Sequence, residues 1–265
     1  MRFHEAVSVR LRIGGVPFGV GAPLLTGMAE DPTVDFVRET PSRLIEQLRK
    51  GQLDAALVSS IEAFRMPGYR VAPGLCIACE GPARSVRAFL RPGSRIRTVA
   101  LDSGSEAAAA LLRVLLARVL HAENCKFTRI DPTVQPAQAA EDLVLLIGDA
   151  GLRADPGDRT VLDLGQLWYE WTQLPFVFAL WLLRPGAAAA AVLPILRRAR
   201  ELAQERGVPD GTDGAIYYTL GESELAGLMR FRREAGALNL LDPRILPTFL
   251  SPTDISDSSA SHHDG

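Results

Sequence analysis

The chain has 265 residues, which suits either one large domain or two smaller lobes. Apolar residues make up 47% of it, enough for a sizeable core, and this excludes a chain that is disordered throughout. The 29 lysines and arginines nearly balance the 31 aspartates and glutamates, for a formal net charge of −2. Because no excess of cations is available to neutralise phosphates, we expect no nucleic-acid partner.

The first half of the chain predicts strands alternating with helices. Residues 7–13 alternate strictly between apolar and polar side chains, which indicates a half-buried strand, and a glycine-rich loop follows. Residues 34–38 and 53–58 predict two more strands, separated by a helix over residues 40–50. Further strands are expected over residues 69–78, 85–90 and 98–101.

The second half continues the alternation. A long helix should follow residues 102–105 and run to about residue 121. Strands are then expected over residues 127–130, 143–147, 161–164 and 176–183, and helices over residues 167–172, 187–206, 215–220 and 223–236. Residues 251–265 are rich in serine, aspartate and histidine, so we expect a disordered tail.

This alternation predicts an α/β fold with parallel sheets and crossover helices. The pattern breaks near residues 97 and 175, where we expect the chain to leave one lobe and to return to it. Residues 1–97 and 175–250 should therefore form the first lobe, and residues 98–174 the second. Two crossing segments would make a hinge, with a cleft between the lobes.

Export and membrane insertion are not predicted. Residues 1–12 lack the continuous apolar stretch of a secretory signal. The most apolar segments, residues 107–120 and 187–196, are too short or too interrupted by arginine to span a bilayer. We therefore expect a soluble cytoplasmic protein with no membrane partner.

The three cysteines, Cys76, Cys79 and Cys125, indicate reduced thiols rather than a disulfide framework. The spacing of Cys76 and Cys79 resembles half of a zinc site, but no second pair exists. Residues three apart on a strand also face opposite sides of the sheet. We therefore expect these two cysteines to pack in the core, and no metal.

Small or polar residues follow four of the predicted strands, at the ends where open α/β sheets bind ligands. These are residues 17–21, Ser59 with Ser60, residues 102–105, and Gly148 with Asp149. Structural roles are the main alternative: Ser59 and Ser60 could cap a helix, and Asp149 could cap a helix or pair with an arginine across the hinge.

The segment from Asp102 to Ser105 is the sharpest of the four. Ser103-x-x-Glu106 fits a capping box that would begin a helix. Free N–H groups and the helix dipole attract an anion there, and Gly104 would let it approach. Ser103 or Ser105 could then hydrogen-bond a substrate carboxylate, or the segment could be a helix cap without a ligand.

No nucleophile motif, Walker A motif or dinucleotide-binding glycine pattern is present, so spacing alone names no reaction. Four stretches together nevertheless resemble the futalosine-route menaquinone family that includes chorismate dehydratase and its sister, 1,4-dihydroxy-6-naphthoate synthase. They are residues 12–24, residues 41–60, residues 81–86 (Gly-Pro-Ala-Arg-Ser-Val) and residues 146–181. The last is the most specific, with Asp163-Leu-Gly-x-x-Trp168 and Pro175-Phe-Val-Phe-Ala-x-Trp181.

The resemblance implies a two-lobed, periplasmic-binding-protein-like (type II) fold used as an enzyme. Its reaction would be the dehydration of chorismate to 3-[(1-carboxyvinyl)oxy]benzoate, by a hydro-lyase without metal or organic cofactor. Chorismate loses a hydroxyl and a proton and its ring becomes aromatic, so the protein must mainly bind two carboxylates, exclude water and align a proton acceptor. The enolpyruvyl carboxylate of the substrate could itself be that acceptor.

The resemblance also carries Ser85 over as an active-site residue that faces the ring or a carboxylate. One departure concerns the family pattern Tyr-Leu-Asn, which falls here on Phe18, Gly19 and Val20. Valine can neither donate nor accept a side-chain hydrogen bond, so if that asparagine orients the leaving groups, this chain should be slow or inactive, or should use another residue. A carboxylate-binding protein without turnover and the sister synthase are the two alternatives, and the oligomeric state, a homodimer included, stays open.

Overall fold

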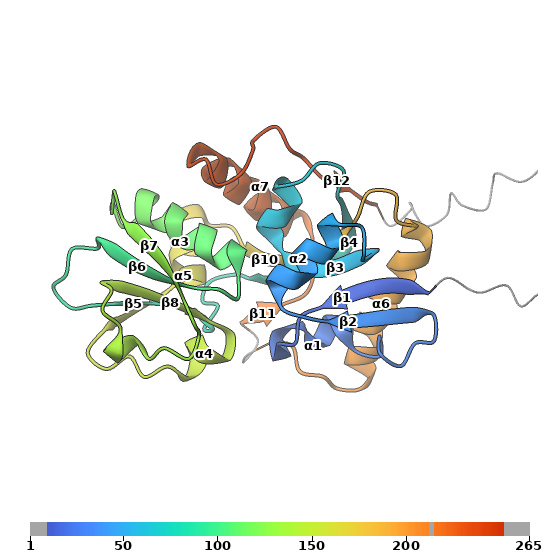
Figure 1. The fold of residues 1–265 in the computed structure, drawn as a ribbon, viewed down its shortest axis with the longest axis horizontal. Coiled ribbons are helices and arrows are strands. Elements are labelled where there is room, and N and C mark those ends of the chain that lie inside the picture. Colours follow the sequence, from blue (N-terminus) through green and yellow to red (C-terminus); the bar gives the residue numbers. More distant parts are fainter. Residues whose placement is uncertain (1–9, 212–214, 252–265) are drawn as a thin grey trace, which may run out of the picture.

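Two α/β lobes make up the protein, as Figure 1 shows for the computed structural model, which describes residues 10–211 and 215–251. The first lobe holds a seven-stranded sheet in the order β11-β4-β10-β3-β1-β2, with β12 also paired to β4. Its strands are β1 (Leu11–Gly15), β2 (Val34–Arg38), β3 (Ala55–Ser59), β4 (Arg70–Cys79), β10 (Phe176–Leu183), β11 (Ile216–Tyr217) and β12 (Thr248–Phe249). Its helices are α1 (Ala22–Leu25), α2 (Pro41–Arg49), α6 (Ala189–Glu205) and α7 (Glu222–Ala237), with short 3-10 helices η1 (Gly19–Gly21) and η2 (Ser60–Phe64).

The second lobe holds a five-stranded sheet in the order β7-β6-β8-β5-β9. Its strands are β5 (Val86–Leu90), β6 (Thr98–Asp102), β7 (Lys126–Ile130), β8 (Leu143–Ile147) and β9 (Thr160–Asp163). Its helices are α3 (Glu106–Arg118), α4 (Gly148–Arg153) and α5 (Leu164–Thr172), with the 3-10 helix η3 (Pro136–Gln138). The strands β1, β2 and β3 in one sheet and β6, β7 and β8 in the other pair in parallel, as predicted. Strand β10 pairs antiparallel with β3 and β4, and β5 with β8 and β9, so both sheets are mixed and the prediction of wholly parallel sheets is wrong.

The first crossing between the lobes lies earlier than the sequence indicated. Strand β5 pairs with β8 and β9, so it belongs to the second sheet, although the boundary near residue 97 had assigned it to the first lobe. The chain therefore crosses over residues 80–85. The Pro92-Gly93 break is a turn within the second lobe, where the backbone N–H of Arg91 donates to the carbonyl of Asp142 at 2.8 Å. The return crossing lies between α5 and β10, close to the expected residue 175.

Two other expectations fall differently. Part of the segment over residues 215–220, expected to be helical, forms β11, because Ile216 and Tyr217 pair with the edge of β4. The predicted first strand begins at Leu11, and its expected residues 7–9 lie outside the described residues. The expected disordered tail also lies outside them, except for Ser251.

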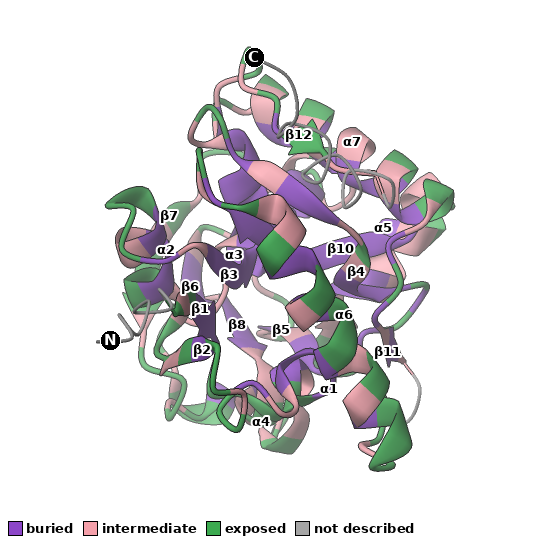
Figure 2. Cartoon of the chain, turned by 90° about the vertical axis from the view of Figure 1, so that its right-hand side faces the viewer, coloured by how far each residue is buried: buried purple, intermediate pink, exposed green. Residues whose placement is uncertain are grey.

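The core runs through the strands of both sheets, and Figure 2 shows exposed residues on the outer side of helices such as α6. Strand β3 is buried along its whole length, as is typical of a strand covered on both faces. Cys76 and Cys79 are buried, which confirms that they pack in the core. Their burial raises the pKa of both thiols above its ordinary value.

Helix α5 joins the lobes through an aromatic cluster. The indole of Trp168 on α5 lies edge-on to Phe176 of β10 and to Phe231 of α7, with ring centroids 5.4 and 6.3 Å away. The same indole N–H donates to the carbonyl of Pro175 at 3.2 Å. This second-lobe helix is thereby fixed to the first-lobe sheet beside the return crossing.

The first turn of α5 also lies directly against the other crossing, at Gly165. A Cβ at this position would lie 2.6 Å from the Cys79 sulfur and 3.0 Å from the backbone nitrogen of Ala83. We expect Gly165→Ala to lower the free energy of unfolding by about 1–3 kcal/mol, the usual effect of overpacking, as measured by urea denaturation. Gly19→Ala is the matched control, since nothing lies within 4 Å of a Cβ there, and wild-type stability in Gly165→Ala would contradict the close approach.

Candidate functional site

The candidate site lies at the strand ends that the sequence singled out. In the second lobe β6 and β8 run in parallel, so the residues after Asp102 and after Ile147 lie at one edge of the sheet. Strand β5 runs antiparallel to β8 with Val86 opposite Ile147, which brings Ser85 to the same edge. The structure thus places Ser85, the Ser103–Ser105 segment and Gly148 at one end of the second sheet.

Ser85 lies in a tight turn before β5 and is only 7% exposed. Its backbone N–H donates to the carbonyl of Ala83 at 2.7 Å, and its hydroxyl lies 3.4 Å from the same oxygen. Helix α4 packs directly on this turn, because a Cβ on Gly151 would lie 2.6 Å from the Ser85 carbonyl oxygen. The serine is therefore held in one place by backbone contacts.

A buried carboxylate ties the neighbouring loops together. Asp102, 1% exposed, accepts the backbone N–H of Gly104 at 2.7 Å on one oxygen and that of Ile147 at 3.1 Å on the other. Burial raises the pKa of Asp102 from its ordinary value, while the two backbone N–H groups act in the opposite direction. The loop after β6 and the end of β8 are thereby joined.

The helix that follows this loop begins at Glu106, and Ser105 is its N-cap, with the hydroxyl accepting from the Ala108 N–H at 3.2 Å. The expected capping box on Ser103 is wrong, because Asp102 holds Gly104 in a turn and delays the start of the helix. Ser103 is exposed in this turn. The first N–H groups of a helix lack helical acceptors, so this end of α3 suits a carboxylate.

The first-lobe serines divide between two roles. The Ser60 hydroxyl donates to the carbonyl of Val177 at 2.7 Å and holds β10 beside η2. Ser59 precedes η2 without a side-chain cap, so the helix-cap alternative is wrong for both serines. Ser59 is buried at the end of β3 and remains a candidate contact.

Asp149 and Val20 each have a bonding partner in their own lobe. Asp149 is exposed and pairs at 3.3 Å with Arg153 of its own helix, so its arginine partner does not lie across the hinge. Val20 lies in η1 with its side chain packed against the core, and its carbonyl accepts from the Tyr218 hydroxyl at 2.9 Å. Phe18, two residues earlier, is 44% exposed.

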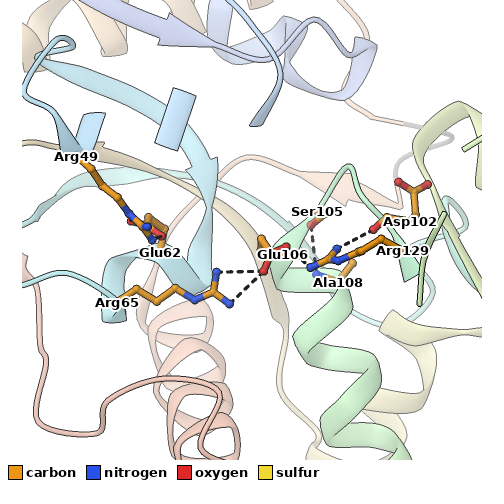
Figure 3. A network of polar contacts seen from close by, with 8 residues as sticks. All are labelled: Arg49, Glu62, Arg65, Asp102, Ser105, Glu106, Ala108 and Arg129. Atoms are coloured by element: carbon orange, nitrogen blue, oxygen red, sulfur yellow. Dashed lines mark hydrogen bonds and ion pairs between the residues drawn. The ribbon is translucent and has the colours of Figure 1, made fainter. Parts of the chain in front are cut away.

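An ion-pair network that sequence reasoning missed joins the two lobes (Figure 3). Both terminal nitrogens of Arg65, at the end of η2, lie 3.1 Å from one oxygen of Glu106, the first residue of α3. Arg129 of β7 binds the other oxygen and also donates to the Asp102 carbonyl at 3.2 Å. The sequence pattern predicts Glu106 as half of a capping box and gives no sign of its pairing with arginines.

A second, more deeply buried ion pair holds η2, the short helix that Arg65 directly follows. Glu62 of η2 is fully buried and accepts two hydrogen bonds from Arg49 of α2, at 2.7 and 2.6 Å (Figure 3). Such two-pronged pairs are the strong and directional ones. They fix η2, and with it the residue that reaches Glu106.

Removal of the central charge should loosen this interlobe contact. We expect Glu106→Gln to lower the free energy of unfolding by about 1 kcal/mol and to speed amide hydrogen exchange in residues 60–65 and 106–110. Glu46→Gln removes two more exposed ion pairs, with Arg43 of α2 and with Lys50 just after it, and should leave exchange in those segments unchanged. Equal exchange in the two variants would show that the network does not hold the lobes together.

The described part of the chain offers neither a metal site nor a membrane-spanning helix. Within it, no three His, Cys, Asp or Glu side chains gather in a way that could hold a metal ion. No described helix has the length and apolar character needed to cross a membrane. A cavity of about 200 Å³ lies between β4 and α6, elements that carry none of the candidate residues.

These two lobes and their paired strand ends define the periplasmic-binding-protein-like α/β class. A protein of Archaeoglobus fulgidus superimposes with a TM-score of 0.66 at 18% identity, over 89% of this chain and all of the other. The periplasmic aliphatic sulphonate-binding protein of Escherichia coli gives 0.57 at 17% identity, over 89% and 94% of the two chains. A Candida albicans protein described as having the generic periplasmic binding protein fold gives 0.53 at 11% identity, over 91% and 97%.

Sequence comparison defines the family within that class. Residues 11–208 match the family described as menaquinone biosynthesis, and the chain belongs to this family. A chorismate dehydratase of Thermus thermophilus is 28% identical over 212 residues, which are 69% of this chain and 76% of that protein. The family indicated by the four sequence stretches is thereby confirmed.

Proposed function

We propose that the chain is a chorismate dehydratase, a hydro-lyase that forms 3-[(1-carboxyvinyl)oxy]benzoate in the cytoplasm, in the futalosine route to menaquinone. The observation that carries the proposal is the placement of Ser85, whose buried turn lies at the same sheet edge as the N-terminal end of α3. The 28% identical chorismate dehydratase supports the choice of substrate.

Chorismate carries two carboxylates, and the strand ends offer groups of the right chemistry for them. The first N–H groups of α3, with the hydroxyls of Ser103 and Ser105, bind one carboxylate. Gly104 permits the close packing of this loop on Ile147, because a Cβ there would lie 2.9 Å from the Ile147 side chain. The Ser85 hydroxyl bonds the ring side of the substrate, and Ser59 contacts it from the first lobe. With the lobes over the substrate, water is excluded and every polar contact strengthens.

The reaction needs little more than this alignment. The C4 hydroxyl leaves, the C3 proton is removed, and the ring becomes aromatic, so the driving force lies in the substrate. The enolpyruvyl carboxylate of chorismate takes the proton, and the protein holds that carboxylate near C3. No metal or organic cofactor enters these steps.

A second candidate function is a carboxylate-binding protein without turnover, and Val20 favours it. The side chain at this position packs on the core and its carbonyl is already bonded to Tyr218, so the position offers no polar side-chain atom to a substrate. The two functions differ in whether product forms after binding.

The direct test is incubation with chorismate at neutral pH without added metal. We expect chorismate to disappear and the aromatic product to form, and Ser85→Ala to lower kcat on the order of 10²-fold, as loss of a positioned donor does. Ser94→Ala is the matched control, since the Ser94 hydroxyl bonds the Arg91 carbonyl in a turn of the second lobe. Chorismate that stays unchanged over hours with folded wild-type protein would refute dehydration, and tight binding measured by calorimetry would then establish the second candidate.

Substitution at Val20 tests the departure from the family pattern. We expect Val20→Asn to raise kcat at least several-fold, because it supplies an amide where the valine has none. Val20→Ala, which changes the volume without adding a polar group, should not raise it. If both variants behave alike, the position has no polar role in this chain.

A further inference from the structure

We propose that Asp163 is a positioning residue that sets the conformation of the Ala83–Ser85 turn and thereby aims the Ser85 hydroxyl. The inference rests on the proposed function, in which Ser85 contacts the substrate. Asp163 is the last residue of β9 and the N-cap of α5. In this proposal it acts through the turn and not by contact with the substrate.

One carboxylate gathers three backbone N–H groups from two segments. The Oδ1 atom of Asp163 accepts from Gln166, in the first turn of α5, at 3.1 Å and from Ala83 at 2.9 Å. Its Oδ2 atom accepts from Arg84 at 2.6 Å. Hydrogen bonds to an ionised acceptor are shorter and stronger than neutral ones, so the turn is bound firmly to the start of α5.

The turn needs such a partner because its backbone is unfavourable. Arg84 has a φ of 59°, in the left-handed region that non-glycine residues seldom adopt. The Asp163 carboxylate binds the N–H of this residue and of the residue before it, which stabilises the strained conformation. Ser85 follows directly, so the φ of Arg84 determines where the serine hydroxyl points.

Close packing on two sides restricts how the turn can move. On one side a Cβ on Gly165 of α5 would lie 2.6 Å from the Gly81 carbonyl oxygen. On the other side Gly151 of α4 approaches the Ser85 carbonyl equally closely. Without the carboxylate the turn can relax only by a local backbone change, and that change would move Ser85.

The three hydrogen bonds of Asp163 to Ala83, Arg84 and Gln166, here called the clamp, also determine to which lobe Ser85 is fixed. Residues 80–85 form the first crossing between the sheets, yet Asp163, α4 and α5 all lie in the second lobe. The serine is thus fixed relative to α3 and its N-terminal N–H groups. The Ser85 turn and the N-terminal end of α3 therefore keep their geometry relative to each other within the second lobe, and Ser59 is the contact that the first lobe adds.

The test is a double-mutant cycle on turnover of chorismate. Asp163→Asn keeps the size of the side chain but has one acceptor oxygen where the carboxylate has two. We expect it to lower kcat on the order of 10²-fold with KM changed less than about threefold, because misplacement of an aligned group has effects of this size. In a Ser85→Ala background the same substitution should cause no further loss. Additive losses in the cycle would overturn the inference.

The matched control is Asp142→Asn. The Asp142 carboxylate also accepts backbone N–H groups in the second lobe, from Arg97 and Thr98 at 2.9 Å each, but it precedes β8, at the opposite end of that strand from Ile147, which pairs with Val86 beside the Ser85 turn. This variant should lose comparable thermal stability and keep its kcat. An equal loss of kcat in the two variants would show that Asp163 contributes only to the stability of the lobe and does not position Ser85.

A readout without turnover separates this inference from the proposed function. In Asp163→Asn we expect amide hydrogen exchange of residues 83–86 to rise at least tenfold, with the Asp142→Asn variant unchanged there. If wild-type protein does not convert chorismate, the proposed function fails while this measurement still shows whether Asp163 holds the turn. Unchanged exchange in Asp163→Asn would reject the clamp.

Discussion

The constraint on which the rest of the structure depends is the double passage of the chain between the two sheets, secured by helix α5. One passage runs from β4 to β5 and the other from α5 to β10. The first turn of α5 packs against the first passage at Gly165, and its Trp168 contacts the second passage at Pro175. A single short helix thus holds both connections, and the edge that carries Ser85 is built next to it.

Buried or half-buried carboxylates recur as acceptors for backbone N–H groups in the second lobe. Asp102 joins the loop after β6 to the end of β8. Asp142, the residue just before β8, bonds the first residue of β6. Asp163 joins the start of α5 to the Ser85 turn. A carboxylate has two acceptor oxygens and can satisfy N–H groups from two segments at once, which one backbone carbonyl does less readily. Loops that no strand pairing holds acquire fixed geometry in this way.

The fold was predicted well from sequence because its signals are local. Apolar residues run through β3, β8 and β10, and a glycine follows α2. Such patterns predict an element from its own residues alone, whatever packs against it. The lobe boundary was misplaced because strand pairing is not local: nothing in residues 86–90 says that they pair with β8 rather than with β4. The two-residue strand β11 was missed for the same reason, since only the edge of β4 makes it extended.

The candidate site was predicted in outline, and its supporting contacts were not. Strand ends followed by serine and glycine are visible in the chain, but Arg65 and Arg129 reach Glu106 from segments 41 and 23 residues away. The same holds for Asp163, which acts on residues about 80 positions earlier in the sequence. Long-range polar contacts of this kind leave no periodic trace in one sequence.

The clamp that joins Ser85 to the second lobe has a consequence for ligand capture. In the proposed function, the Ser85 turn and the N-terminal end of α3 meet a ligand as one preassembled surface of the second lobe, and the contact from Ser59 of the first lobe adds to that surface.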